Sequence, residues 1–136
     1  MKSHNIIVLA TTDKMAELVE WCRNNIHYLK CHNLHTTLVI AELLRDITVV
    51  AHHIDSTGGT STVEFVSLKG NVKTTLHYNN VNQQLVELIM NNVIDGFVYF
   101  CDKLDDNLKQ LSIKYNMPVA LNKNNDDRII NLLTSD

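Results

Sequence analysis

Several short polar clusters follow apolar runs in this sequence, and their residue types are those that bind anions or transfer protons. Three of them are TTD at 11–13, HTT at 35–37 and CD at 101–102. A fourth, DSTGGTST at 55–62, places two glycines among five hydroxyl side chains. Glycines let backbone N–H groups turn toward a phosphate and hydroxyls add donors, but the same residues also form ordinary turns. The clusters therefore predict an anion site only if the fold brings them together.

The elements around these clusters alternate between strand and helix patterns. Apolar runs at 6–10 and 96–100 are typical of strands buried on both faces of a parallel sheet, and weaker strand patterns lie at 31–35, 47–54 and 118–121. Apolar residues at helical spacing predict helices at 13–29, 38–46, 82–92, 104–115 and 126–133. Such alternation implies right-handed crossovers. We expect a single α/β domain over 1–136 with a doubly wound, mainly parallel five-stranded sheet.

One segment interrupts the alternation. The strand-like strings TVEFVSL and NVKTTLHY flank Lys69-Gly70, which is typical of a hairpin turn. We expect an inserted β-hairpin over about 60–81, with one apolar face and both of its ends at the rim of the ligand pocket.

The polar clusters follow the predicted strands, where ligands bind in open α/β sheets. Thr37 would stand at the start of a helix, where free N–H groups favour an anion. Polar residues also cap helices at this edge in α/β proteins generally. The pattern therefore predicts a pocket but does not specify a reaction.

Metal and thiol chemistry are less well supported by the sequence. His52 and His53 are neighbours on a predicted strand, so they point to opposite faces, and the seven histidines show no spacing typical of zinc sites. A thiolate at Cys101 would be disfavoured by the adjacent Asp102. We expect no metal, no cofactor and an inert, buried Cys101.

Composition limits the classes of partner. The net charge is −3 and the twelve Lys and Arg are scattered, which disfavours nucleic-acid binding. No apolar run approaches the ~20 residues that a membrane span needs. Three cysteines without paired spacing, and an N-terminus without signal-peptide features, predict a cytoplasmic protein with reduced thiols and no membrane partner.

The order of the strings resembles the methylglyoxal synthase family, whose domain recurs in carbamoyl phosphate synthetase and IMP cyclohydrolase. The matching strings are IIVLATT, HTT, TGG, NQQLVELI, VIDGFVYFCD and MPVALN, over about residues 5–133. The pair Gly58-Gly59 resembles the family's glycine pair, which runs directly into Asp-Gln-Gln. Here the predicted hairpin separates it from Asn82-Gln83-Gln84. The resemblance implies the family's fold, with its active-site loop split by the insertion.

The resemblance also implies that the family's proton-transfer groups are replaced. The catalytic Asp of Asp-Gln-Gln corresponds to Asn82, whose amide accepts no proton near neutral pH. The family's Ala-His-Asp corresponds to ATT at 10–12, and its later histidine has no counterpart in the segment KLDDN. Only Asp102 keeps its place. Each lost acid or base typically costs about 10²- to 10⁴-fold in rate, so we expect almost no elimination of phosphate from dihydroxyacetone phosphate.

These inferences lead to one principal hypothesis and two alternatives. The principal hypothesis is a non-catalytic domain that senses or sequesters a phosphorylated metabolite or nucleotide at the carboxyl edge of the sheet. The alternatives are an active methylglyoxal synthase-type lyase, with Asp13 or Asp55 replacing a lost group, and a protein-interaction module that uses the hairpin. We also expect a homo-oligomer, since an inserted hairpin exposes strand edges. The residues expected to contact the ligand are Thr11, Thr12, His35, Thr36, Thr37, Ser56, Thr57, Gly58, Gly59, Asn82 and Asp102.

Overall fold

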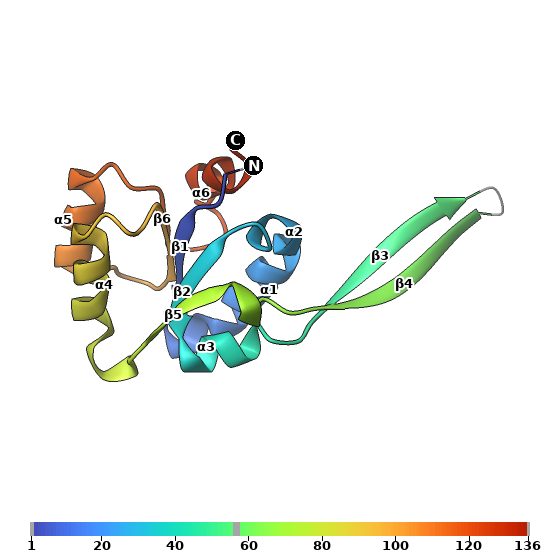
Figure 1. Cartoon of the computed structure of the whole chain (residues 1–136), viewed down its shortest axis with the longest axis horizontal. Helices are drawn as coiled ribbons and strands as arrows, with labels where there is room; N and C mark the ends of the chain where they lie inside the picture. The colour runs from blue at the N-terminus through green and yellow to red at the C-terminus, as the bar shows by residue number, and fades with distance from the viewer. Residues whose placement is uncertain (1, 56–57, 136) are drawn as a thin grey trace.

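The central feature of the computed structural model, which describes residues 2–55 and 58–135, is a sheet with helices on both sides (Figure 1). Its five strands lie in the order β5-β2-β1-β6-β7, and their pairings are parallel. This confirms the expected α/β class and the parallel five-stranded sheet. The strands are β1 (Asn5–Ala10), β2 (Asn33–Thr37), β5 (Val72–Leu76), β6 (Gly96–Phe100) and β7 (Val119–Ala120).

Two groups of helices cover the sheet, since its middle strands bury side chains on both faces. The helices α4 and α5 lie together on one side, and α1, α2 and α3 lie on the other (Figure 1). The predicted helix at 13–29 is divided into a 3₁₀ turn η1 (Thr12–Lys14), α1 and α2, with Asn25 between the last two. The helices are α1 (Met15–Asn24), α2 (Ile26–Leu29), α3 (Leu38–Leu43), α4 (Val81–Met90), α5 (Asp106–Lys114) and α6 (Asp127–Thr134).

Gly96, at the start of β6, allows α6 to approach the sheet. A Cβ atom at this position would lie 2.7 Å from the Leu132 side chain and 3.1 Å from that of Ile6. Trp21 of α1 meets Phe100 edge to face, with the ring centroids 6.0 Å apart. Because residues 96 and 100 lie on the same face of the strand, α1 and α6 cover the same side of the sheet.

The inserted hairpin lies elsewhere than the sequence predicts. Strand β3 (Ile47–Asp55) pairs antiparallel with β4 (Gly58–Val66), and the two project from the body as a long arm (Figure 1). The prediction of a hairpin over 60–81 is therefore wrong, because its second half contains β5, which pairs parallel with β2 in the main sheet. The predicted strand at 47–54 exists, but it belongs to the arm.

Burial explains why β4 pairs with β3 rather than with β5. Lys69-Gly70 lies in a 3₁₀ turn, η2 (Lys69–Asn71), that leads the chain from the arm into the sheet. Leu68 and Leu76 on either side of it are 0% and 3% exposed, whereas eight of the nine residues of β4 are exposed. The Asn71 side chain fixes this turn by donating to the carbonyls of Lys30 and His32, at 2.9 Å each. The segment after η2 therefore folds into the core, and β4 does not.

Candidate functional site

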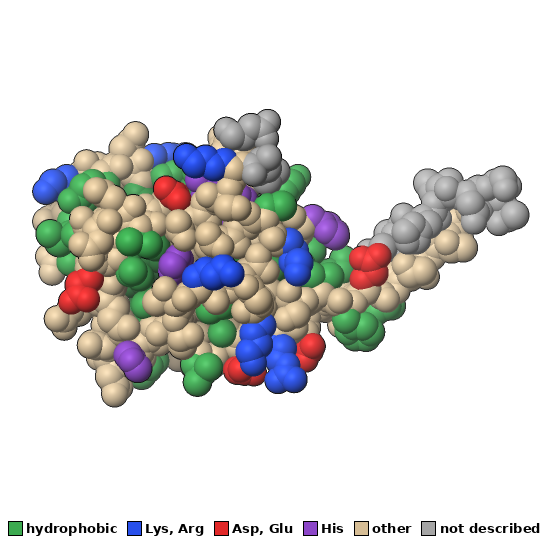
Figure 2. Space-filling view, viewed as in Figure 1, with side chains coloured by type: hydrophobic (Ala, Val, Ile, Leu, Met, Phe, Trp, Pro, Cys, Tyr) green, Lys and Arg blue, Asp and Glu red, His purple; other side chains and the backbone are tan. Residues whose placement is uncertain are grey.

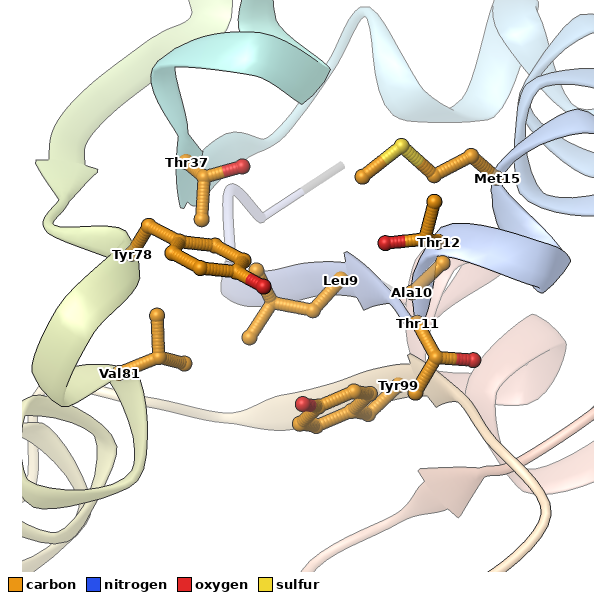
Figure 3. Close-up of a pocket in the computed structure, with 9 residues that line it drawn as sticks. All are labelled: Leu9, Ala10, Thr11, Thr12, Met15, Thr37, Tyr78, Val81 and Tyr99. Atoms are coloured by element: carbon orange, nitrogen blue, oxygen red, sulfur yellow. The ribbon is translucent and has the colours of Figure 1, made fainter.

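A pocket of about 200 Å³ opens at the carboxyl edge of the sheet, between the ends of β1, β2 and β6 (Figure 3). This is the edge at which parallel α/β sheets bind ligands. Strand β1 supplies the floor, η1 and α1 one wall, and the start of α4 with the turn before it the other. The lining residues are Leu9, Ala10, Thr11, Thr12, Met15, Thr37, Tyr78, Val81 and Tyr99.

Three of the threonines expected at the site, Thr11, Thr12 and Thr37, line this pocket. The Thr12 hydroxyl points toward its middle, whereas the Thr11 hydroxyl turns away (Figure 3) and donates to Asp13 Oδ1 at 2.8 Å. Thr37 Oγ1 accepts the Ile40 N–H at 3.4 Å and so caps α3. A hydroxyl that accepts one bond still has its own proton to donate. Thr12 and Thr37 are therefore the threonines best placed to donate to a ligand.

Thr36 and His35, also expected at the site, do not line the pocket. Thr36 is fully buried and its hydroxyl donates to the Val8 carbonyl on β1, so it fastens β2 to the neighbouring strand. His35 is 3% exposed, and its Nε2 lies 3.0 Å from Asn5 Oδ1. Burial lowers the pKa of His35, so the imidazole is neutral near pH 7. Both residues support the strands rather than the pocket.

Two tyrosines, Tyr78 and Tyr99, dominate the opening of the pocket, and both rings point into it (Figure 3). Tyr99 comes from β6, directly opposite Leu9 of β1. Burial, together with the nearby Cys101, Tyr78 and Asp105, raises the pKa of Tyr99, so its hydroxyl stays protonated and can donate. Tyr78 is 79% exposed, which is unusual for an aromatic side chain that lines a pocket.

Gln84 fixes the segment that carries Tyr78. Its side-chain amide accepts the His77 N–H at 3.0 Å and donates to the carbonyls of His77 and Asn80, at 2.9 and 3.1 Å. The Gln84 amide also donates to Asn80 Oδ1 at 2.6 Å. The 3₁₀ turn η3 (Tyr78–Asn80) is thus held against α4 by one side chain. Tyr78 is exposed, but its backbone is fixed.

Two carboxylates interact with residues that line the pocket. The lining residues that the structure describes carry no charged side chain. Around them lie Asp13, which accepts the Thr11 hydroxyl, and Asp105, one of the groups that raise the pKa of Tyr99. Lys14 is paired with Asp102 at 3.4 Å. The carboxylates of Asp13 and Asp105 beside the lining favour a neutral ligand group in the pocket over a bare phosphate.

Asn82 and Asp102, which correspond to functional positions of the family in the resemblance, are not among the residues that line the pocket. Asn82 is the second residue of α4 and lines an adjoining hollow of about 430 Å³, which shares Tyr78 and Tyr99 with the pocket. The side chain of Asp102 is 83% exposed and points to Lys14. Cys101 is buried, and burial and then Asp102 raise the pKa of its thiol, so it is no nucleophile near neutral pH.

The glycine pair lies far from the pocket. Gly58 and Gly59 begin β4 at the outer end of the arm, where they pair with Asp55 and Ile54 (Figure 1). Gly58 has φ of 121°, a conformation that other residues rarely adopt. The prediction that Gly58 and Gly59 contact the ligand therefore does not match their position at the end of the arm. Ser56 and Thr57 lie outside the described residues.

Six lining residues are not among the predicted ligand contacts: Leu9, Ala10, Met15, Tyr78, Val81 and Tyr99. Tyr99 had a usable signal, because alternation along GFVYF places it on the face opposite to Phe100, at the end of a strand. No pattern in the sequence indicated Tyr78, because the segment before Asn82 was predicted to belong to the hairpin. Within 2–55 and 58–135, no group of three or more His, Cys, Asp and Glu is placed to hold a metal ion. No helix among these residues is long and apolar enough to cross a membrane.

Comparison with known proteins supports the fold assignment. No family model and no curated protein sequence matches the chain. Among solved structures, the chain is similar to methylglyoxal synthase from Elizabethkingia anophelis NUHP1, with a TM-score of 0.67 and 22% sequence identity. The match covers 98% of this chain and 78% of the other. The chain therefore has a methylglyoxal synthase-like fold, with the β3–β4 arm as a separate two-stranded sheet.

Proposed function

We propose that this chain is a non-catalytic domain that binds a small ligand at the carboxyl edge of its sheet, and so senses or sequesters it. The observation that supports this best is the lining of the pocket, which consists of hydroxyl, aromatic and aliphatic side chains. A few convergent polar groups in an otherwise apolar hollow are typical of small-molecule sites.

Of the two ligand classes expected from the sequence, the pocket favours a nucleotide over a small phosphorylated metabolite. The rings of Tyr78 and Tyr99 can stack on a planar base, and an exposed Tyr78 would be covered by it. Thr12 and Thr37 offer hydroxyls to the polar edge of a base or to a ribose. The surrounding carboxylates favour a bound pose in which the phosphate faces solvent.

The absence of catalysis is proposed from the same residues. General acid-base catalysis needs a group whose proton moves near neutral pH. The described pocket lining offers threonine hydroxyls and two tyrosines, of which Tyr99 has a raised pKa. Asn82, at the position of the family's base, carries an amide.

Ligand binding is tested by heating the purified protein and identifying the released small molecules by mass spectrometry. Thermal shifts across a panel of nucleosides, nucleotides and triose phosphates then rank the classes. We expect Tyr99→Leu to weaken binding about tenfold or more, the loss of one stacking contact of ~1.4 kcal/mol. Thr37→Val should also weaken it, while Thr37→Ser, which keeps both the hydroxyl and the cap, should not.

The matched control is Ile113→Ala, an exposed residue on α5 that lies away from the pocket. It should leave every ligand shift unchanged. If no compound in the panel stabilises the protein, and none is released from it, the binding proposal is wrong. If triose phosphates bind and nucleotides do not, the choice of ligand class is wrong.

The active lyase remains the second candidate, because the structural neighbour is described as a methylglyoxal synthase. It is tested by supplying dihydroxyacetone phosphate and measuring methylglyoxal. We expect turnover well below about 1 s⁻¹, the lower end of typical enzyme rates. A rate above that value would replace the binding proposal with the catalytic one.

A further inference from the structure

The pocket at the sheet edge continues into the adjoining hollow, because the two share part of their lining. The pocket measures about 200 Å³ and the hollow about 430 Å³, and Tyr78, Val81 and Tyr99 border both. Small-molecule sites typically measure roughly 300–1,000 Å³, so the pocket by itself is smaller than a typical site. A ligand of ordinary size that enters the pocket therefore also extends into the hollow.

The hollow is lined mainly by amide side chains. Besides the shared residues it is bordered by Asn79, Asn80, Asn82 and Gln83, which come from η3 and the first turn of α4. Asn80 Oδ1 accepts the Gln84 amide at 2.6 Å, whereas the other three side chains have no hydrogen-bonding partner in the part of the chain that the structure describes. Each of these amides can both donate and accept, which suits a group that does both, such as a ribose hydroxyl.

Among the described residues, neither lining holds a cation that could bind a phosphate, since neither includes a Lys, Arg or His side chain. Lys14, which precedes the lining residue Met15, is paired with Asp102 at 3.4 Å. In the view of Figure 2, the surface over η3 and the start of α4, at the lower left, consists mainly of uncharged side chains, and the blue Lys and Arg side chains lie elsewhere. A phosphate in the hollow would thus lack the charge-assisted hydrogen bonds that such groups form with Arg and Lys.

A fixed carboxylate acts on the wall that the pocket and the hollow share. Burial and, among other groups, Asp105 raise the pKa of Tyr99. Asp105 Oδ2 accepts the N–H groups of Asn107 and Leu108, at 3.1 and 3.4 Å, and these bonds hold the carboxylate in place. The N–H groups at the start of α4 attract an anion, but with about half an elementary charge, against the full charges of Asp105 and Asp13. The balance of charge at the site therefore opposes a phosphate.

We propose that the ligand of this site is a nucleoside without a phosphate group, with its base in the pocket and its ribose in the hollow. This inference rests on the proposed ligand-binding function and narrows its ligand class. The base lies against Tyr78 and Tyr99, and the ribose hydroxyls bond to amides of the hollow, Asn82 among them. Each phosphate added at the 5′ position brings negative charge toward the carboxylates, so affinity falls from the nucleoside to its triphosphate.

The first test compares nucleosides with their own phosphates. Isothermal titration calorimetry on the whole chain uses adenosine, guanosine, cytidine and uridine, each beside its 5′-monophosphate and 5′-triphosphate. For the base that binds best, we expect the triphosphate to bind at least about tenfold more weakly than the nucleoside. Because this difference is electrostatic, it should shrink when the ionic strength rises from about 0.02 M to about 0.5 M. The affinity for the nucleoside should not change with salt.

The second test changes the charge of the site. Asn82→Lys places a cation in the hollow, so it should raise the affinity for the triphosphate at least about tenfold and remove the preference for the nucleoside. Asp105→Asn keeps a side chain that can cap α5 and removes one carboxylate, so it should narrow the difference about threefold. The matched control is Ile113→Lys on α5, which adds the same charge as Asn82→Lys at a residue that is 71% exposed. It should leave the preference for the nucleoside unchanged.

The outcomes separate this inference from the proposed function. If no compound binds at all, the binding function is wrong, and this inference is wrong with it. If only compounds of another class bind, or if nucleotides bind as tightly as nucleosides, the inference is wrong and the binding function stands. The same holds if rising salt weakens nucleotide binding, since the phosphate would then be attracted to the site. If Ile113→Lys shifts the preference as much as Asn82→Lys, the phosphate does not lie near the hollow, and the inference is also overturned.

Discussion

The carboxyl edge of the sheet and the β3–β4 arm are built from similar residues, yet different contacts hold them in place. At the sheet edge, Thr36 bonds to β1, Thr37 caps α3, and Gln84 fixes the turn that carries Tyr78. In the arm, β4 pairs with β3 alone, and eight of its nine residues are exposed. The sheet edge is fixed by contacts with several elements. Beyond its root, where Val49 and Val66 pack on the core, the arm is held by a single ladder.

This difference separates two kinds of functional surface. A pocket that binds a small ligand needs positioned groups, and hydrogen bonds hold Thr37 and the segment carrying Tyr78 in place here. A surface that binds another chain can stay exposed until the side chains of its partner pack on it. We therefore expect changes in the body to alter folding and ligand binding, and changes in the arm to alter association.

The largest expected effect on stability comes from replacing strands by a short linker, once in a segment that includes part of the body and once in the arm alone. Replacing 60–81 by a short Gly-Ser link removes β5 together with half of the arm, and we expect the chain to lose cooperative thermal unfolding. Replacing only 50–63 shortens the arm and keeps Val66, which packs on the core. Its free energy of unfolding should change by less than about 1 kcal/mol. If both shortened chains lose cooperative unfolding, the arm stabilises the body, and the two regions are not held independently.

Two phenylalanines allow the same comparison with point substitutions. Phe97 on β6 is 1% exposed, so Phe97→Ala should lower the free energy of unfolding by about 3–5 kcal/mol. Phe65 on the arm is 78% exposed, so Phe65→Ala should change it by no more than about 0.5 kcal/mol. Urea denaturation of dilute protein measures both. A large loss for Phe65→Ala would mean that the arm packs within its own chain.

The pH dependence of the free energy of unfolding should show the effect of burying His35 in the body. Burial lowers the pKa of His35 below its usual value of 6.5, so between the two values the unfolded chain binds more protons than the folded chain. This contribution to stability is complete above pH 6.5 and is lost as the pH falls toward the folded-state pKa. His35→Gln should flatten the curve in that window. An unchanged curve would show that His35 titrates as it does in the unfolded chain.

The smallest expected effect concerns the pocket tyrosine. Asp105 is the last of the groups that raise the pKa of Tyr99, after burial, Cys101 and Tyr78. Asp105→Asn keeps a side chain that can cap α5 and removes the charge, so the pKa of Tyr99 should fall slightly while stability stays the same. NMR titration of ring-labelled tyrosine, assigned with Tyr99→Phe, measures the shift. Asp105→Ala should in addition cost about 1 kcal/mol of stability.

The local pattern of the sequence determined the α/β class and most of the elements. Continuous apolar runs at 6–10 and 96–100 predict the buried strands β1 and β6, because a strand covered on both faces buries consecutive side chains and runs of five residues are too short for a typical helix. Polar residues at the ends of those runs predicted where a pocket would open. Thr11, Thr12 and Thr37 do line it, since the carboxyl ends of parallel strands share one edge.

Only the tertiary structure decided which strands pair and which side chains reach the pocket. The strands β3, β4 and β5 all carry β-branched residues, and the burial of Leu68 and Leu76 selected β5 for the sheet and left β4 to the arm. Thr36 and Thr37 are adjacent in sequence, yet strand alternation directs one to the Val8 carbonyl and the other to the pocket. Tyr78 reaches the pocket because β5 lies beside β2, a nonlocal contact that no sequence window contains.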